Sequence, residues 1–203
     1  MIALKESQTL TPEAYLQFED DHPNKHEYID GEIYAMAGTT DSHNTIALNL
    51  AVLIRSHLRG SNCRIYFADI KARLEERNCF YYPDLLVTCD PRDTETPTYK
   101  RFPKLIVEVL SDSTESFDRG TKFSDYQTLD SLEEYVLVNS YRQQVEVYAR
   151  SEPFGWQYQN NTLSHPTFTL ASIDLKLTLA DVYEDVTLET APAPPSGTSA
   201  TEP

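Results

Sequence analysis

The chain has 203 residues, of which 40% are hydrophobic and 11% aromatic, and this is long enough to bury a substantial core in one domain. Its 17 lysines and arginines are outnumbered by 32 aspartates and glutamates, which gives a net charge of −15. That balance excludes a protein that coats nucleic acid by bulk electrostatic attraction, although an enzyme with a local basic groove stays possible.

The N-terminal part of the sequence predicts a helix followed by a β-hairpin. Thr11 and Pro12 form a helix start with a capping hydroxyl and a proline at the first helical position, so we expect a helix from residue 12 to about residue 19. Asp30-Gly31 suits a two-residue turn between residues 26–29 and residues 32–36. These two segments are therefore predicted to pair in antiparallel fashion.

A longer helix is expected after Gly38, with Asp41 or Ser42 as its cap and Gly60 as its end. After it come predicted strands, separated by a break near residues 68–69 and by polar turns. They cover residues 63–67, 70–74 and 79–82. Residues 90–97 are rich in turn formers and poor in side chains to bury, which predicts a loop.

The second half of the chain predicts a mixture of buried strands and helices. A buried strand at residues 105–110 precedes a helix from about Ser116 to Leu129. Further β structure is expected at residues 135–138, 145–148, 156–158 and 175–177, with a short helix at residues 179–183. The order of elements implies an α/β (α+β mixed) domain over residues 1–190, with a mixed central sheet flanked by helices. Prolines and small polar residues predict a disordered tail at residues 191–203.

Cys63, Cys79 and Cys89 form neither a CxxC pair nor a Cys/His ligand spacing, and an odd number of cysteines cannot complete a disulfide framework. We therefore expect three reduced core residues. Residues 1–20 lack an uninterrupted apolar core, and no stretch approaches the roughly 20 apolar residues of a membrane span. The expected location is cytoplasmic, without a membrane partner.

Two acidic residues lie next to apolar residues in predicted strands. Glu108 is in the middle of the run at residues 105–110, and Asp84 follows Pro83 at the start of another apolar run. A buried charge is costly unless it is paired or bound to a metal. Asp84, Glu108 and the carbonyl of Val109 can supply the oxygen ligands that Mg²⁺ prefers. The alternative is that Asp84 is only a turn residue.

Lys122 lies on the predicted helix after the Glu108 strand. A lysine near a bound cation can orient or deprotonate the attacking water. The alternative is a solvated helix lysine paired with Asp118, four residues earlier. His43 is a catalytic candidate in the first turn of its helix, or else a capping or surface residue.

Together, Pro83-Asp84, residues 108–111, and the set Asp118, Lys122 and Tyr126 resemble the PD-(D/E)xK nuclease superfamily, in particular its Uma-type family of putative restriction-endonuclease-like proteins. The similarity covers most of residues 10–185, including residues 27–32 and the helical His43. It implies a restriction-endonuclease-like core with an N-terminal hairpin. It also implies a metal-dependent endonuclease that hydrolyses DNA phosphodiester bonds with Mg²⁺, or with Mn²⁺ as a substitute, and a homodimer. The net charge of −15 restricts DNA binding to weak or local contact.

The position at which the superfamily pattern expects its lysine is Leu110 in this chain. The resemblance assigns the role to Lys122 instead. Were that lysine unable to reach the site, the chain would be a catalytically inactive nuclease-fold module that binds nucleic acid or a protein partner.

Other polar residues have less specific interpretations. Glu27 and Glu32 flank the hairpin turn and are expected to be solvated, while Tyr126 is either core or bonded to a site carboxylate. A set of basic residues before Asp84 predicts either one locally positive face or an ordinary solvated surface. These are Arg55, Arg59, Arg64, Lys71, Arg73 and Arg77.

Overall fold

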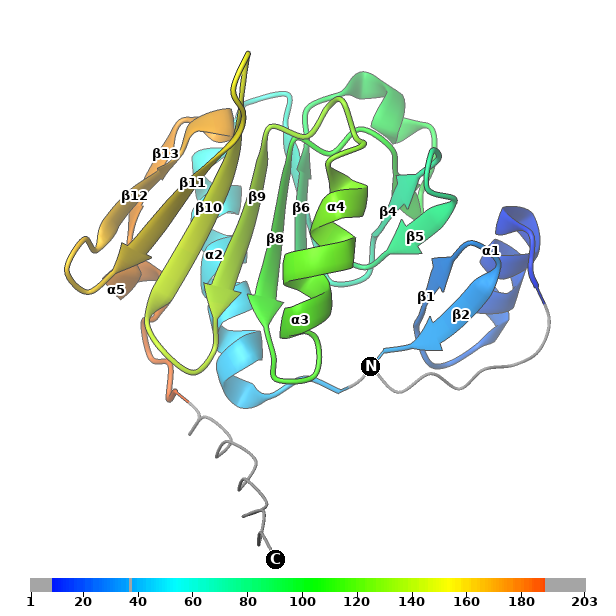
Figure 1. Cartoon of the computed structure of the whole chain (residues 1–203), viewed down its shortest axis with the longest axis horizontal. Coiled ribbons are helices and arrows are strands. Elements are labelled where there is room, and N and C mark those ends of the chain that lie inside the picture. Colours follow the sequence, from blue (N-terminus) through cyan, green and yellow to red (C-terminus); the bar gives the residue numbers. More distant parts are fainter. Residues whose placement is uncertain (1–8, 37, 189–203) are drawn as a thin grey trace, which may run out of the picture.

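The computed structural model describes residues 9–36 and 38–188, and it contains two large β-sheets with helices packed on them (Figure 1). The five-stranded sheet has the order β2-β1-β5-β4-β7, and the six-stranded sheet has the order β11-β10-β9-β8-β6-β3. The expected mixed α/β fold is confirmed. The tail expected at residues 191–203 lies outside the described residues. No helix within the described part is long and apolar enough to cross a membrane.

The five-stranded sheet contains the predicted N-terminal hairpin and is covered by α1 (Pro12–Asp21). Thr11 caps this helix by accepting a hydrogen bond from the backbone N–H of Ala14. Asp30 and Gly31 both have positive φ, as the tight turn between β1 and β2 requires. The strands are β1 (His26–Ile29), β2 (Glu32–Ala35), β4 (Lys71–Leu74), β5 (Cys79–Tyr81) and β7 (Tyr99–Lys100).

The six-stranded sheet is antiparallel except for the parallel pair β8 and β9. Its strands are β3 (Arg64–Phe67), β6 (Leu85–Thr88), β8 (Leu105–Leu110), β9 (Glu134–Asn139), β10 (Gln144–Ser151) and β11 (Gly155–Thr162). Alternate side chains of β8 pack into different clusters on the two faces of the sheet. The central strands are therefore buried on both sides, as the apolar run at residues 105–110 predicts.

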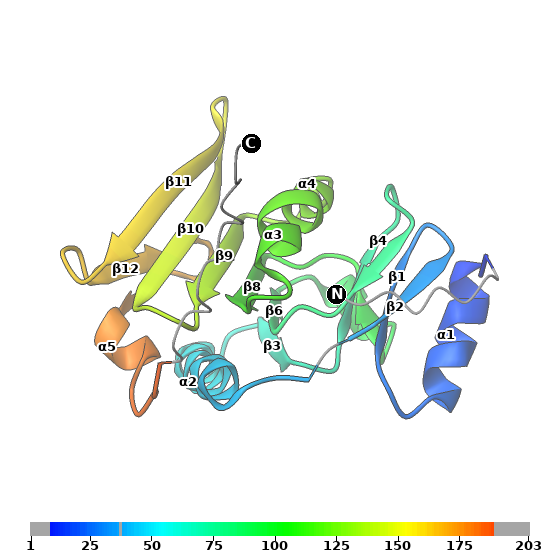
Figure 2. The same cartoon turned by 60° about the horizontal axis from the view of Figure 1, so that its bottom comes forward.

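One face of this sheet packs against α2 (Asp41–His57) and the C-terminal elements β12 (Thr167–Leu170), η3 (Ala171–Ile173), β13 (Leu175–Thr178) and α5 (Leu179–Val182). The other face packs against the segment formed by α3 (Glu115–Phe117), η2 (Asp118–Lys122) and α4 (Phe123–Tyr126). Figure 2 shows α2 and α3 on opposite sides of the sheet. The sequence did not predict β7 or β12. The cap of α2 is Thr40 rather than Asp41 or Ser42.

The helix expected from Ser116 to Leu129 is interrupted by a π-helical turn, η2, and ends at Tyr126. In a regular α-helix, positions four apart drift by about 40° around the axis, since each residue turns about 100°. A π-helical turn contains more residues, so each residue turns by a smaller angle and the drift between positions four apart is reduced. Asp118, Lys122 and Tyr126 are accordingly all buried.

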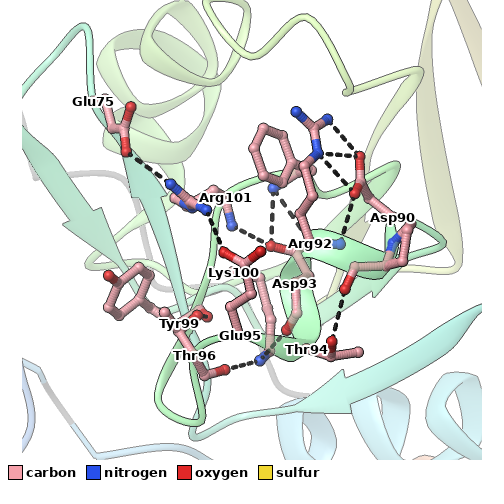
Figure 3. Close-up of polar contacts among 12 residues, drawn as sticks. Glu75, Asp90, Arg92, Asp93, Thr94, Glu95, Thr96, Tyr99, Lys100 and Arg101 are labelled. Atoms are coloured by element: carbon pink, nitrogen blue, oxygen red, sulfur yellow. Dashed lines mark hydrogen bonds and ion pairs between the residues drawn. The ribbon is translucent and has the colours of Figure 1, made fainter.

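The loop predicted at residues 90–97 contains the short 3-10 helix η1 (Pro91–Thr94) and buries little, as expected, since Asp93 is its one buried residue (Figure 3). Asp93 is buried and accepts hydrogen bonds from the backbone N–H of Arg101, at 2.7 Å, and of Phe102. Lys100 is also buried and donates to the carbonyl of Asp93 at 2.8 Å. These two charged side chains can be buried because backbone groups of the loop bond to them.

The expectation of three reduced cysteines holds only for Cys79, which is free and buried. Cys63 and Cys89 form a disulfide. Strands β3 and β6 pair in antiparallel fashion with Arg64 opposite Thr88, so the next residue outward on each strand faces the other. This pairing is a long-range property of the sheet, and the spacing of the cysteines does not reveal it.

Removal of this disulfide is expected to destabilise the fold. The bond closes a loop of 26 residues, and the lower entropy of the cross-linked unfolded chain stabilises the folded state by about 3 kcal/mol. The double variant Cys63→Ser, Cys89→Ser should lose about that much free energy of unfolding in a urea titration. A reductant should lower the stability of the wild type similarly and leave the variant unchanged. Equal stability of variant and oxidised wild type would contradict the expectation.

Candidate active site

The antiparallel pairing of β6 and β8 brings Asp84 and Glu108 together. Leu85 lies opposite Val107, so one step further along the pair Asp84 lies opposite Glu108, with both side chains on the same face. The backbone N–H of Asp84 donates to Glu108 Oε2 at 3.4 Å. The backbone N–H of Val109 donates to Asp84 Oδ2 at 2.7 Å. The two carboxylates therefore converge, and Asp84 is more than a turn residue.

Glu108 is only 4% exposed and points to the same side of the sheet as Ile106 and Leu110, since side chains alternate along a strand. Its Oε1 atom accepts a hydrogen bond from the Tyr126 hydroxyl at 3.2 Å and lies 2.9 Å from Lys122 Nζ. The buried acid is thus paired, as its cost of burial requires. Tyr126 is both a core residue and a partner of this carboxylate.

Lys122 reaches this cluster from η2 and is 5% exposed, so the alternative of a solvated lysine is wrong. Its Nζ atom lies 2.9 Å from Glu108 Oε1, 3.1 Å from Glu27 Oε1 and 3.5 Å from Asp118 Oδ1. The pairing with Asp118 that the sequence offered is present, but inside the protein. Although Leu110 occupies the position of the expected lysine, the amine of Lys122 lies beside Glu108.

Glu27 is the site residue that the sequence interpretation missed. It was expected to be solvated, yet it is 4% exposed, and its Oε1 atom accepts a hydrogen bond from the backbone N–H of Tyr82 at 3.1 Å. Its position in the resemblance was its only signal, because its burial results from packing between two sheets. Glu32, across the turn, is half-buried and accepts a hydrogen bond from the Tyr34 hydroxyl at 2.8 Å.

His43 comes from the first turn of α2, and its side chain is 15% exposed, so the surface alternative is wrong. Its Nε2 atom lies 3.3 Å from Asp84 Oδ2, and its Nδ1 atom lies 2.9 Å from the Thr39 hydroxyl. Burial lowers the pKa of His43, but its hydrogen bond to Asp84 and the charge of that residue outweigh burial and raise the pKa. The backbone of Val109 and the charge of Asp118 raise the His43 pKa further.

These side chains line a cleft of 330 Å³ whose charge balance is strongly negative. Among the described residues that line it, Lys122 and His43 are the side chains able to carry positive charge. They face a larger set of carboxylates, namely Glu27, Asp84, Glu108, Asp112 and Asp118. Such an excess of negative charge favours binding of a cation.

The pKa values of Glu108 and Lys122 are both shifted by burial and by the charges around them. Burial raises the pKa of Glu108 well above its usual range; Lys122 opposes this shift, and the charges of Asp118 and Asp84 add to it. Burial alone would lower the pKa of Lys122, but the charges of Glu108 and Glu27 outweigh it and leave the pKa well above its usual range. Lys122 is therefore protonated at neutral pH and acts as a hydrogen-bond donor.

The donor set fits a hard divalent cation better than a metal that needs a closed ligand cage. Within residues 9–36 and 38–188, no group of three or more His, Cys, Asp or Glu side chains is arranged to hold a metal. Mg²⁺ requires only one or two carboxylates and keeps several waters. Asp84 and Glu108, which line the same cleft, can supply those two carboxylates.

Two of the basic residues before Asp84 make contacts within the protein. Lys71 is buried, and its amine donates to the Tyr82 hydroxyl at 3.1 Å. Arg77 pairs with Asp125 at 3.3 Å. These two charges are occupied by contacts within the protein.

Comparison with known proteins identifies the family of this chain. The family described as "Uma2: Putative restriction endonuclease" matches residues 12–180. Two relatives from Synechocystis sp., named uncharacterized proteins slr1290 and sll1609, are 39% and 32% identical. The first alignment covers 86% of this chain and 91% of the relative, and the second covers 77% and 89%.

A solved structure, described as a putative nuclease belonging to DUF820 from Anabaena variabilis, has a similar fold. It superimposes with a TM-score of 0.69 at 17% sequence identity, and the match covers 86% of this chain and 97% of that one. At this identity the likeness shows the fold alone.

Proposed function

Since the chain belongs to the Uma2 family of putative restriction endonucleases, we propose that it is a metal-dependent endonuclease that hydrolyses phosphodiester bonds in DNA. The observation that carries the proposal is the convergence of Asp84 and Glu108, with Lys122 Nζ 2.9 Å from Glu108. We include Mg²⁺ as the metal, Mn²⁺ as its substitute, and a catalytic domain over residues 1–190. A cytoplasmic location and a homodimer belong to the same proposal.

In this proposal, Asp84, Glu108 and the Val109 carbonyl hold the metal. A bound cation would polarise the phosphodiester and stabilise the charge that develops on it. Lys122 keeps its proton and donates hydrogen bonds, so it orients the attacking water or a phosphate oxygen rather than deprotonating the water. His43 orients Asp84 through Nε2, while Thr39 fixes the other ring nitrogen.

The acidic cleft also supports the expectation of weak or local DNA binding. DNA affinity normally depends on lysines and arginines that neutralise phosphates. Among the described residues, Lys122 is the one lysine or arginine that lines the cleft, and it already faces Glu27, Glu108 and Asp118. The cation would therefore supply the main attraction for the scissile phosphate.

The direct test is cleavage of supercoiled plasmid with Mg²⁺ or Mn²⁺. Asp84→Ala should lower the rate of nicking at least about 100-fold, because it removes one metal ligand. Asp130→Ala, at an exposed position, should leave the rate unchanged, and a chelator should stop the wild type. Equal nicking by wild type and Asp84→Ala would identify a contaminating nuclease and overturn the proposal.

The second candidate is a non-catalytic module that binds nucleic acid or a protein partner. The observation that favours it is Leu110 at the position of the superfamily's lysine, together with the acidic composition. Titration calorimetry with Mn²⁺ separates the two candidates. Absence of binding near neutral pH would favour the module, whereas binding that Glu108→Gln abolishes would favour the enzyme.

A further inference from the structure

We infer that Glu27 is a positioning residue that holds the Lys122 amine in its working place, so that the N-terminal hairpin is part of the active site. This inference rests on the proposed function. Glu27 belongs to β1 of the five-stranded sheet, whereas Glu108 belongs to β8 of the six-stranded sheet. The amine of Lys122 lies between them, 3.1 Å from one carboxylate and 2.9 Å from the other.

Glu27 is itself held by a backbone hydrogen bond in addition to its ion pair with Lys122. The same Oε1 atom that faces Lys122 accepts a hydrogen bond from the N–H of Tyr82 at 3.1 Å. The hydroxyl of Tyr82 donates to Glu19 at 2.8 Å and accepts from Lys71 at 3.1 Å. Glu19 is in α1 and Lys71 is in β4, so Tyr82, whose backbone N–H bonds the Glu27 carboxylate, is itself anchored to two further elements.

The need for Glu27 follows from the competing role of Glu108. In the proposed function Glu108 is shared with a divalent cation, which weakens its attraction for the Lys122 ammonium. Asp118 is the other carboxylate within reach, at 3.5 Å. A lysine has a long flexible chain, and with Asp118 alone its amine would no longer be held between the two sheets. Glu27 keeps the amine there through its contact with Lys122, while its hydrogen bond from the Tyr82 backbone holds its own carboxylate.

A variant series separates this role from a purely structural one. Glu27→Ala should lower kcat about 10- to 100-fold, the usual effect of losing an orienting partner, with KM and Mn²⁺ affinity nearly unchanged. Glu27→Gln should recover part of kcat, because its side-chain oxygen can accept the same hydrogen bonds. Glu133→Gln breaks an exposed glutamate–lysine pair with Lys104 and should change nothing.

Single-turnover rates of the double variant show whether Glu27 acts through Lys122. If it does, Glu27→Ala should cause no further loss of rate in a Lys122→Ala background. The same fold-loss in both backgrounds would overturn the inference. So would a loss of rate that appears only as a rise in KM.

A second readout does not need turnover. The Lys122 ammonium should give a ¹⁵N NMR signal protected from exchange with water, assigned by its loss in Lys122→Arg, and Glu27→Ala should shift it or broaden it by faster exchange. If wild type fails to cleave DNA, the proposed function fails, while this signal still decides the positioning role. A signal that is the same in wild type and Glu27→Ala would overturn that role.

Discussion

Glu108→Gln is expected to lower Mn²⁺-dependent cleavage by about 1,000-fold and to abolish Mn²⁺ binding in calorimetry. Glutamine has nearly the same shape but no negative charge, so it removes the buried carboxylate on which the proposed cation depends. The side-chain oxygen can still accept the hydrogen bond that Tyr126 donates at 3.2 Å. Lys122 keeps Glu27 and Asp118 as partners, so the fold should persist, as circular dichroism would show.

A matched control is available on the neighbouring strand. Glu134 is 2% exposed and accepts hydrogen bonds from the backbone N–H groups of Ala171 and Ser172, each at 2.9 Å. Glu134→Gln therefore changes a buried glutamate away from the cleft and should leave cleavage per folded molecule unchanged. Full Mn²⁺ binding by Glu108→Gln would show that the metal is not held as proposed.

Features that depend only on residues close together in the sequence were predictable. The helix after Thr11, the hairpin turn at Asp30-Gly31 and the helix before Gly60 all follow from local backbone preferences, and the structure contains each of them. The disulfide between Cys63 and Cys89 was not predictable, because it depends on which strands pair. Strand β12 was missed because it has only four residues, too few for its alternation of exposed and buried side chains to stand out as a strand pattern.

The same distinction applies to the site. Asp84 and Glu108 were identifiable because each lies next to strongly apolar residues, which makes an unpaired charge costly. Glu27 has no such local signal, and its role depends on how β1 and β5 pack beside η2. The π turn that keeps Lys122 and Asp118 on one buried face was also missed, since the spacing of four residues predicts an ordinary helix equally well.

Lys122→Ala is expected to lower cleavage by about 1,000-fold while preserving metal binding. The loss follows because the ammonium beside Glu108 has no replacement among the described residues that line the cleft. Mn²⁺ affinity should be retained or increased, since the cation no longer competes with the lysine for that carboxylate. Lys122→Arg keeps the charge but not the shape of the amine, and it should keep the fold and lose cleavage as well.

The stability of Lys122→Ala should depend on pH in a defined direction. Removing one partner of a buried ion pair costs about 3–5 kcal/mol, and it leaves Glu27, Glu108 and Asp118 without their shared cation. Loss of the lysine removes the opposing effect on Glu108, so its pKa rises further above its usual range. A carboxyl whose folded pKa exceeds its unfolded pKa contributes stability that is full at low pH and is lost as the pH rises. The free energy of unfolding relative to wild type should therefore increase as the pH falls from about 8 to about 5, and Mn²⁺ should recover stability at neutral pH. If Lys122→Ala and Lys122→Arg cleave DNA at the wild-type rate in preparations that retain Mn²⁺ binding, Lys122 has only a structural role as the partner of Glu108.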